Sequence, residues 1–395
     1  MGRDRNLSLE AALERARQIA PSPGAEEVPV PDAAGRTLAE DVRAERDLPP
    51  RATSAMDGWA VRAADTPAAL AAIGESVAGR PSDRALRPGE AVEISTGAIV
   101  PEGADAVARR EVVRVEGTTV RVEVRVAPGR DVRRQGEVIR TGQVLHPAGH
   151  RVAPHEVGGL GAVGRATVLC ARRIRVAILS NGEELVPLGA VADPAQVHDS
   201  SRHGLAAQAR AAGALVTTSA VVGDDLERTV ELVAALLDAG GDERPDVLIT
   251  NGGIGHGPHD HLRAALERLG VEEVVPGVRA STIRPTVIGA RGDQVVLGLP
   301  GNPVAAAVAL HVLGRPVLRA PEDWWRRAPL TVDVASRAGR ADLVRCVEGP
   351  DGLTPTADQT SHAVTSLAGA TALAWVAEDA EGVEAGRPVP FSRMS

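Results

Sequence analysis

The chain has 395 residues, of which 44% are hydrophobic and 24% charged, so its composition excludes wholesale disorder and collagen-like repeats. Its 44 basic residues are all arginine, and with 52 acidic residues the formal net charge is −8. The sequence contains no basic block and no basic stripe interleaved with aromatic residues, which argues against a protein that wraps nucleic acid.

The N-terminal half predicts one helix followed by a β-rich region. Ser8 precedes an apolar stripe at helical spacing, which predicts a helix that Ser8 caps and that ends before Pro21. From about residue 85 to 170 the pattern changes to short Val-rich runs broken by Gly and Pro. These runs predict strands at 91–94, 112–115, 119–126 and 166–169.

From Ile174 onward, strand patterns alternate with helical patterns. The expected strands are 174–179, 215–222, 246–250 and 295–298, and the expected helices are 201–213, 225–238, 260–269 and one from about 303. This alternation predicts a Rossmann-like α/β domain with a parallel sheet and right-handed crossovers. Beyond Pro316 and Pro321, further short β patterns predict a small C-terminal β domain.

Four loops follow the expected strands of this sheet, at the edge where open α/β sheets bind ligands. They read SNGEE (180–184), GDD (223–225), NGGIGHG (251–257) and LPGNP (299–303). Their glycines and free helix-terminal amides favour a phosphate or carboxylate ligand. The rim also carries five carboxylates that would repel such an anion, so we expect Mg²⁺ to bridge the two. These carboxylates belong to Glu183, Glu184, Asp224, Asp225 and Asp260.

Each of these motifs also has a structural interpretation. Many strand-to-helix turns need glycine, so GGIGHG alone is weak evidence, and Asn302 could serve as a helix cap as well as a ligand contact. The histidines around this loop could chelate a transition metal, but the loop is rich in Gly and Pro and has no thiolate, which favours solvated histidines. These histidines are His198, His203, His256, His259 and His261.

The sequence predicts a cytoplasmic protein. Cys170 and Cys346 are too few and too distant in sequence to suggest a disulfide framework. The N-terminus lacks the apolar core of a signal peptide, and no stretch approaches the ~18 to 20 apolar residues that span a bilayer. We therefore expect no membrane partner.

Eight strings, in order along nearly the whole chain, resemble the MoeA and gephyrin E-domain family, the molybdopterin molybdenumtransferases. They are SAMDGWAVR, ISTGAIVPEGADAVARRE, VRRQGE, RIRVAILSNGEEL, VVGDD, DVLITNGGIGHGPHD, VVLGLPGNPVAA and QTSHAVTSLAGATALA. The resemblance implies a multidomain α/β plus β fold, an elongated homodimer whose Rossmann-like molybdopterin-binding domain is MoaB/Mog-like. It implies domain I at 22–42 and 142–165, β-rich domain II at 43–141, molybdopterin-binding domain III at 7–21 and 166–318, and β domain IV at 319–395.

The resemblance also implies an activity, namely insertion of molybdate into adenylylated molybdopterin with release of AMP, dependent on Mg²⁺. Its implied partners are the pterin substrate, a second copy of the chain and other molybdenum cofactor proteins. The matching strings place catalytic roles on Asp57, Thr96, Glu184 and Asp260, with Glu184 and Asp260 holding the metal. They place substrate binding on Asn181, Asp225, Gly252, Gly253, Arg284, Pro300, Gly301, Asn302 and Pro303.

The chain departs from the family pattern at several of these strings. Asn181 and Glu183 replace the Thr and Asp of TGDEL, Val138 replaces the carboxylate of GED, and Ser281 and Arg284 stand where KPGKP has its two lysines. An alternative function is therefore a catalytically impaired paralogue that binds molybdopterin or a related nucleotide as a binding or regulatory module. An unrelated glycosyl or phosphoryl transferase on a similar sheet would leave the β-rich segments unexplained.

Overall fold

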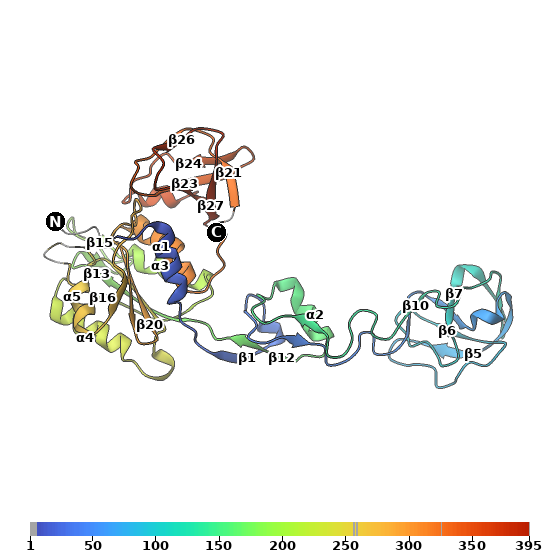
Figure 1. Ribbon diagram of the computed structural model, residues 1–395. Helices are drawn as coiled ribbons and strands as arrows, with labels where there is room; N and C mark the ends of the chain where they lie inside the picture. Colours follow the sequence, from blue (N-terminus) through green and yellow to red (C-terminus); the bar gives the residue numbers. More distant parts are fainter. Residues whose placement is uncertain (1–5, 256, 258–259, 325, 395) are drawn as a thin grey trace. The chain divides into compact units, whose positions relative to one another are not determined.

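The computed structural model describes residues 6–255, 257, 260–324 and 326–394 (Figure 1). The chain forms two compact units, which we describe separately. The inserted unit is Ala25–Ala171, and the flanking unit consists of the segments on either side, Met1–Gly24 and Arg172–Ser395. The division into four domains remains a prediction.

The flanking unit contains a six-stranded sheet in the order β16-β13-β17-β20-β19-β18. Its strands are β13 (Arg175–Asn181), β16 (Leu215–Val222), β17 (Val247–Asn251), β18 (Glu272–Val275), β19 (Val287–Arg291) and β20 (Gln294–Leu299). The four strands expected from the sequence are parallel, but β18 and β19 add an antiparallel edge, so the sheet is mixed. Only Gly292 and Asp293 connect β19 to β20, and a connection this short permits only antiparallel pairing.

Helices cover both faces of this sheet. They are α1 (Leu9–Gln18), α3 (Ser200–Ala211), α4 (Leu226–Leu237), α5 (Leu262–Arg268) and α6 (Pro303–Ala309), which continues through the π-helix η6 (Leu310–Gly314) into α7 (Arg315–Val317). Val176 and Ile178 of β13 pack with α1, α3 and α6, whereas the alternate residues Ala177 and Leu179 pack with α4 and α5. Figure 1 shows α4 and α5 on the opposite side of the sheet from α1 and α3.

The N-terminal helix has the cap that the sequence predicts. The Ser8 hydroxyl accepts a hydrogen bond from the Ala11 N–H at 3.2 Å. Leu9, Ala12, Leu13 and Ala16 are buried against the sheet, so the apolar stripe is the face that packs.

The C-terminal part is a small β domain, as expected. Its main sheet has the order β21-β27-β25-β23-β24, and a separate pair is formed by β22 and β26. The strands are β21 (Arg326–Pro329), β22 (Val334–Ala335), β23 (Asp342–Gly349), β24 (Gly352–Pro355), β25 (Ala372–Val376), β26 (Gly382–Val383) and β27 (Pro388–Arg393). Side chains from these strands, including Leu353 and the single phenylalanine, Phe391, form a core of their own.

A buried polar network joins this β domain to the helices of the sheet. The Nε2 atom of His311, in η6, lies 2.9 Å from the Ser392 hydroxyl, which in turn donates to the Asp323 carboxylate. Because the hydroxyl gives its only proton to Asp323, it must accept from His311, which is therefore protonated on Nε2. His311 is only 8% exposed, and its burial lowers its pKa from 6.5 to about 4.

The inserted unit is built from β-structure, as the sequence predicts. Its larger sheet has the order β7-β4-β6-β5-β9-β8, and three two-stranded pairs are β1–β12, β2–β11 and β3–β10. Its helix α2 is Val157–Ala162. The strands are β1 (Ala25–Pro29), β2 (Val42–Arg43), β3 (Thr53–Ser54), β4 (Gly58–Val61), β5 (Ala68–Ser76), β6 (Glu90–Ile94), β7 (Ala106–Arg109), β8 (Val113–Glu116), β9 (Thr119–Val122), β10 (Val132–Arg133), β11 (Val144–His146) and β12 (Thr167–Ala171).

Short 3₁₀ turns link several of these elements. They are η1 (Val30–Asp32), η2 (Ala63–Asp65), η3 (Arg110–Val112), η4 (Pro154–Glu156), η5 (Gly241–Glu243) and η7 (Val364–Leu367). Cys170 and Cys346 are both buried free thiols, in line with the sequence. Within the described ranges, no helix has the length and apolar character needed to span a bilayer.

Candidate active site

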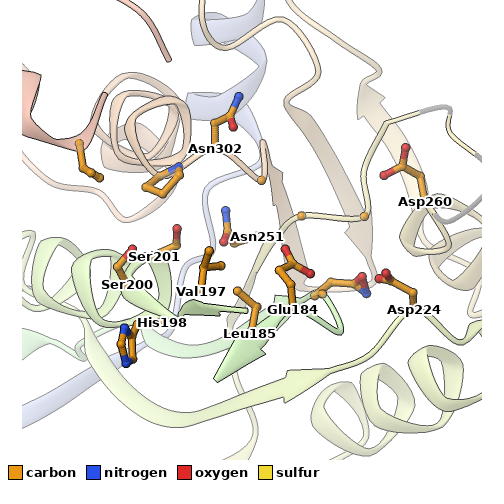
Figure 2. A pocket seen from close by; sticks show the side chains of 17 residues that line it. Glu184, Leu185, Val197, His198, Ser200, Ser201, Asp224, Asn251, Asp260 and Asn302 are labelled. Carbon is orange, nitrogen blue, oxygen red and sulfur yellow. The ribbon is translucent and has the colours of Figure 1, made fainter. Parts of the chain in front are cut away.

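A cavity of about 690 Å³ lies at the carboxyl edge of the parallel strands. Figure 2 shows the side chains that line it, which come from several loops and from the start of α3. The loops after β13, β17 and β20 were all expected to meet there, and they do. Of the residues that the sequence proposed for the site, those lining the cavity are Asn181, Glu184, Asp224, Gly252, Gly253, Asp260, Gly301, Asn302 and Pro303.

Backbone packing explains why the loop after β17 needs its two glycines. Gly252 and Gly253 have φ angles of +86° and +66°, which residues with a side chain rarely adopt. A Cβ atom on Gly252 would lie 2.7 Å from the Asn181 carbonyl oxygen. The neighbouring Asn251 is buried, and its Nδ2 donates to the Pro300 carbonyl at 2.6 Å. The loop is therefore held tightly between the ends of β13 and β20.

Asn181 packs its amide side chain against the loop that carries Gly252 and Gly253. A Cβ atom on Gly253 would lie 3.0 Å from the Asn181 Oδ1 atom, so the amide packs directly on the loop. Its Nδ2 atom is buried and has no hydrogen-bond partner among the described residues. A buried amide donor normally has an acceptor. Asn181 is thus a candidate donor to a ligand acceptor.

Three carboxylates on different loops line the cavity. Glu184 lies over Gly182, where a Cβ atom would clash with both of its carboxylate oxygens. Asp260 accepts a hydrogen bond from the Gly257 N–H at 2.7 Å, and a Cβ atom on Gly255 would lie 2.6 Å from its Oδ2. Asp224 is the third (Figure 2). Glycine beside Glu184 and Asp260 leaves room for these carboxylates.

The donor chemistry of this cavity suits Mg²⁺, although the carboxylates are not gathered into a three-ligand cluster. Mg²⁺ prefers oxygen ligands and is commonly bound by one or two carboxylates together with substrate phosphates. Within the described part of the chain, a group of three potential ligands within 4.8 Å of one another occurs elsewhere and does not include Glu184, Asp224 or Asp260. Two of these carboxylates could therefore hold Mg²⁺ together with ligand oxygens.

The start of α6 differs from the expected helix cap. Asn302 occupies the N-cap position, but its side chain makes no capping hydrogen bond. Instead, its Nδ2 donates to the Ser361 hydroxyl at 3.1 Å. Val364, further along the same C-terminal loop, lines the cavity. The C-terminal β domain thus contributes to the wall, which the sequence did not indicate.

Several proposed residues lie outside this cavity. The Asp225 carboxylate caps α4 by accepting from the Arg228 N–H at 2.7 Å, and Arg284 is exposed. Ser281, at the first lysine position of the family string, accepts from the Leu343 N–H at 3.3 Å. Glu183 is exposed beside Gly223. Pro300 is buried and supplies the carbonyl that holds Asn251.

Asp57 and Thr96 form a hydrogen-bonded pair in the inserted unit. Asp57 Oδ1 accepts from the Thr96 N–H at 2.7 Å and from its hydroxyl at 3.0 Å. The backbone bond first, and then the hydroxyl bond, lower the pKa of Asp57, so its carboxylate stays ionised. Val138 lies in the same unit with 68% of its surface exposed, an apolar side chain where the family has a carboxylate.

The sequence did not single out one wall of the cavity. This wall comprises Leu185, Val197, His198, Ser200 and Ser201, from β14 (Leu185–Val186), β15 (Val197–His198) and the start of α3. The sequence named His198 of these residues, but as a solvated loop histidine and not as part of the site. The sequence did contain a signal for the start of α3, because Asp199, a residue type that favours the N-cap position, directly precedes an apolar helical pattern. In the structure, its buried carboxylate caps the helix by accepting from the Arg202 N–H at 3.2 Å. His256 and His259 lie outside the described residues, and His261 precedes α5 without capping it.

In a comparison with known proteins, three family models match successive parts of the chain. Residues 7–164 match the MoeA N-terminal region (domain I and II), residues 177–320 match a probable molybdopterin binding domain, and residues 327–393 match the MoeA C-terminal region (domain IV). Together they account for most of the chain, in the order in which its parts were described above.

Relatives and solved structures of similar length also match. A molybdopterin molybdenumtransferase of Bacillus subtilis (strain 168) is 31% identical, covering 97% of this chain and 93% of that protein. Molybdopterin molybdenumtransferase 2 of Mycobacterium tuberculosis (strain ATCC 25618 / H37Rv) is 33% identical, covering 91% and 92%. The crystal structure of a molybdopterin biosynthesis MoeA protein from Pyrococcus horikosii superposes with a TM-score of 0.84 at 31% identity, covering 99% of both chains.

Proposed function

Because the chain belongs to the MoeA family of molybdopterin molybdenumtransferases, enzymes of molybdenum cofactor biosynthesis, we propose that it inserts molybdate into adenylylated molybdopterin and releases AMP. The observation that carries this proposal is the cavity at the sheet edge, whose wall contains Gly252 and Gly253 together with the carboxylates of Glu184 and Asp260. Adenylate is the leaving group, so the site must hold its phosphate while the dithiolene sulfurs bond to molybdenum in place of oxygen ligands of molybdate, which leave as water.

The residues of the cavity have distinct proposed roles. Gly252 and Gly253 let the phosphate-bearing part of the substrate approach the backbone, and the Asn181 Nδ2 donates to a substrate oxygen. Gly301, Asn302 and Pro303 form the opposite edge, beside Ser361. Glu184 and Asp260 would hold Mg²⁺, which supplies positive charge to the phosphate when it is bound. Asp225 and Pro300 lie outside the wall, so we propose that they act through the loops they hold in place. For the exposed Arg284, we propose a contact with an oxyanion of the substrate.

We also propose that Asp57 and Thr96 act in the same reaction, in a homodimeric and cytoplasmic enzyme. The contact between Asp57 and Thr96 supports a role for these two residues, because two hydrogen bonds keep the Asp57 carboxylate ionised and oriented. The dimer is taken from the family resemblance, together with contacts to other proteins of molybdenum cofactor synthesis. Sedimentation of the purified chain tests the dimer, and a single species at the monomer mass of 40.8 kDa would count against it.

The test of the activity is release of AMP from adenylylated molybdopterin in the presence of molybdate and Mg²⁺. Asp260→Asn and Glu184→Gln keep the size of each side chain but remove its charge, so both should abolish Mg²⁺-dependent release. Glu183→Gln is the matched control, because it removes an exposed neighbouring carboxylate outside the cavity wall. Full activity of both cavity variants would exclude these residues as the metal ligands.

A second candidate function is a paralogue that binds molybdopterin or a related nucleotide without inserting molybdenum. It is favoured by the exposed Val138 and by the engagement of Ser281 with Leu343, at two positions where the family carries charge. Wild-type protein that binds the pterin but releases no AMP would support this alternative. Release of AMP by the wild-type protein would exclude it.

A further inference from the structure

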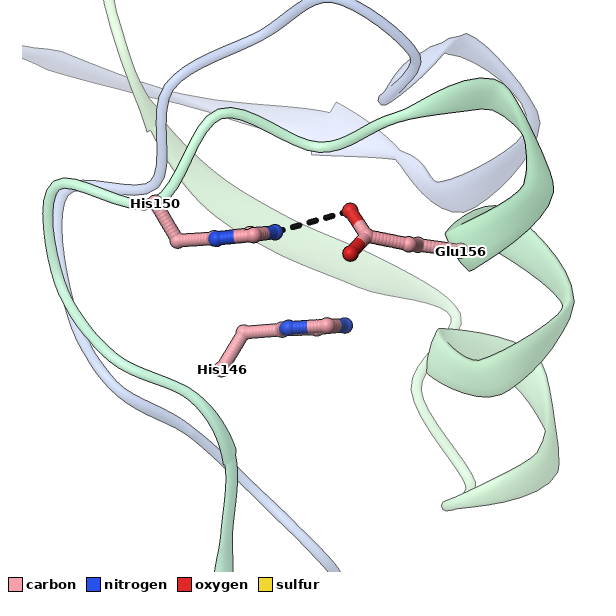
Figure 3. Close-up of side chains that lie close together, drawn as sticks. All are labelled: His146, His150 and Glu156. Carbon is pink, nitrogen blue, oxygen red and sulfur yellow. Dashed lines mark hydrogen bonds and ion pairs between the residues drawn. The ribbon is translucent and has the colours of Figure 1, made fainter.

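A second group of metal-ligating side chains lies in the inserted unit, apart from the residues proposed for the reaction. His146, His150 and Glu156 each offer one ligand atom, and these atoms all lie within 4.8 Å of one another. Figure 3 shows the two imidazoles one above the other, with nitrogen atoms facing the end at which the Glu156 carboxylate lies. The ring centroids are 4.4 Å apart, and the ring planes differ by 4°.

The backbone fixes two of these three ligands in place. His150 follows a turn in which Gly149 has a φ angle of +82°, and its carbonyl accepts from the Leu38 N–H at 2.9 Å. The Glu156 Oε2 atom accepts from the Ala153 N–H at 2.7 Å, which orients the carboxylate. The same oxygen lies 2.7 Å from the His150 Nε2 atom. Such backbone support for a ligand is typical of metal sites.

His146 completes the group from the end of β11. Its ring is partly buried and stacks on the His150 ring, and no hydrogen bond to another described residue fixes the direction of its nitrogen atoms. That freedom matters because a lone pair lies in the plane of its ring, and two parallel rings cannot both point at one ion. A turn of the His146 ring about its Cβ–Cγ bond brings its nitrogen toward the two fixed ligands.

We propose that His146, His150 and Glu156 form a binding site for a divalent transition-metal ion of the Zn²⁺ class. Two imidazoles and one carboxylate are a ligand set that this class favours over Mg²⁺ or Ca²⁺. The ion would replace the hydrogen bond between the His150 Nε2 and Glu156 Oε2 atoms, and a water molecule would fill its fourth position. The site ties the end of β11 and the following turn to the start of α2.

The experiment uses the full-length protein after removal of metals by a chelator, with Zn²⁺ or Co²⁺ as the probe. We expect one ion per chain to bind saturably in competition with a chromophoric chelator, and Co²⁺ to give the visible absorption of a low-coordinate site. His146→Ala and Glu156→Gln should each weaken this binding at least tenfold. His155→Ala is the matched control, because His155 is an exposed neighbour outside the group.

Glu156→Gln keeps an oxygen that can accept from the Ala153 N–H, so this variant is expected to fold, which circular dichroism checks. Thermal unfolding gives an independent measurement, because an ion that binds only the folded state raises its Tm. Zn²⁺ should raise the Tm of the wild type and of His155→Ala but not of the other two variants. Absence of saturable binding, or equal binding by all four proteins, would overturn the proposal.

Discussion

The Nδ2 atom of Asn302 donates a hydrogen bond to the Ser361 hydroxyl at 3.1 Å, which connects the start of α6 to a loop of the C-terminal β domain. Asn302 is part of the cavity wall, and so is Val364, which follows Ser361 in the same loop. The loop is itself anchored to the buried Arg345, whose Nη2 donates to the carbonyls of Asp358 and Thr360. Changes in this loop should therefore affect ligand binding.

Ser361→Ala removes the acceptor for Asn302 and should weaken binding of adenylylated molybdopterin. One hydrogen bond contributes about 1 kcal/mol net, which corresponds to about a fivefold rise in KM or Kd. Thr365→Ala is the control, because Thr365 is exposed in the same loop and lies outside the cavity wall. Equal Kd values for the two variants would show that the contact has no part in binding.

Gly252→Ala should disrupt the loop after β17, which forms part of the cavity wall. The new Cβ atom would lie 2.7 Å from the Asn181 carbonyl oxygen, and the φ angle of +86° is itself unfavourable for alanine. We expect a stability loss of about 1–3 kcal/mol and at least a tenfold loss of pterin affinity. Denaturant unfolding and ligand titration measure the two effects. Gly240→Ala, at a glycine with open space around it, should change neither.

Thr96→Val should raise the pKa of Asp57, because it removes one of the two hydrogen bonds that favour the ionised carboxylate. If Asp57 acts as an ionised group, the acid limb of the pH profile for AMP release moves to higher pH. An NMR titration of the Asp57 carboxyl carbon reports the same shift without reference to activity. Thr118→Val, at an exposed threonine of the same unit, should leave both measurements unchanged.

His311 should make the protein less stable in mild acid. Its folded pKa of about 4 lies below the usual histidine pKa of 6.5, so the unfolded chain binds more protons as the pH falls between these values. Because of this difference, the contribution of His311 to the free energy of unfolding is about 2 kcal/mol smaller at pH 5 than at pH 7. Urea unfolding of wild type and His311→Gln at both pH values isolates the effect, since glutamine can still donate to Ser392. An equal pH dependence of both proteins would contradict the assignment.

Local patterns identified most of the sheet but not its antiparallel edge. Apart from Arg175, the segment 174–179 is apolar, and the eight residues of β16 were expected with the observed bounds. β18 and β19 were missed because Pro276 and Pro285 interrupt the pattern around them, and the Gly-Asp pair at 292–293, which suits a two-residue hairpin turn, was missed with them. Strand order then depends on tertiary pairing, which a local pattern does not contain.

The candidate site likewise contains some residues that local sequence patterns predicted and others that only the tertiary structure brings together. Asn181, Gly252 and Gly301 were expected together because the carboxyl ends of parallel strands meet at one edge. Ser361 and Val364 were not expected, since they approach the cavity through packing of a distant part of the chain. His146 and His150 have the three-residue spacing found in some metal sites, but the local pattern did not indicate their third ligand, because the turn at Gly149 and the 3₁₀ turn η4 bring Glu156 to them.

The inserted unit begins and ends at the same place in the structure. Ala25 pairs with Ala171 across β1 and β12, and within the flanking unit the Arg172 N–H donates to the Gly24 carbonyl at 3.0 Å. A linker of two or three small residues between Gly24 and Arg172 should therefore yield a shortened polypeptide that folds around the sheet alone. Its cooperative melting would mark the excised segment as a module that evolution could exchange without rebuilding the cavity at the sheet edge.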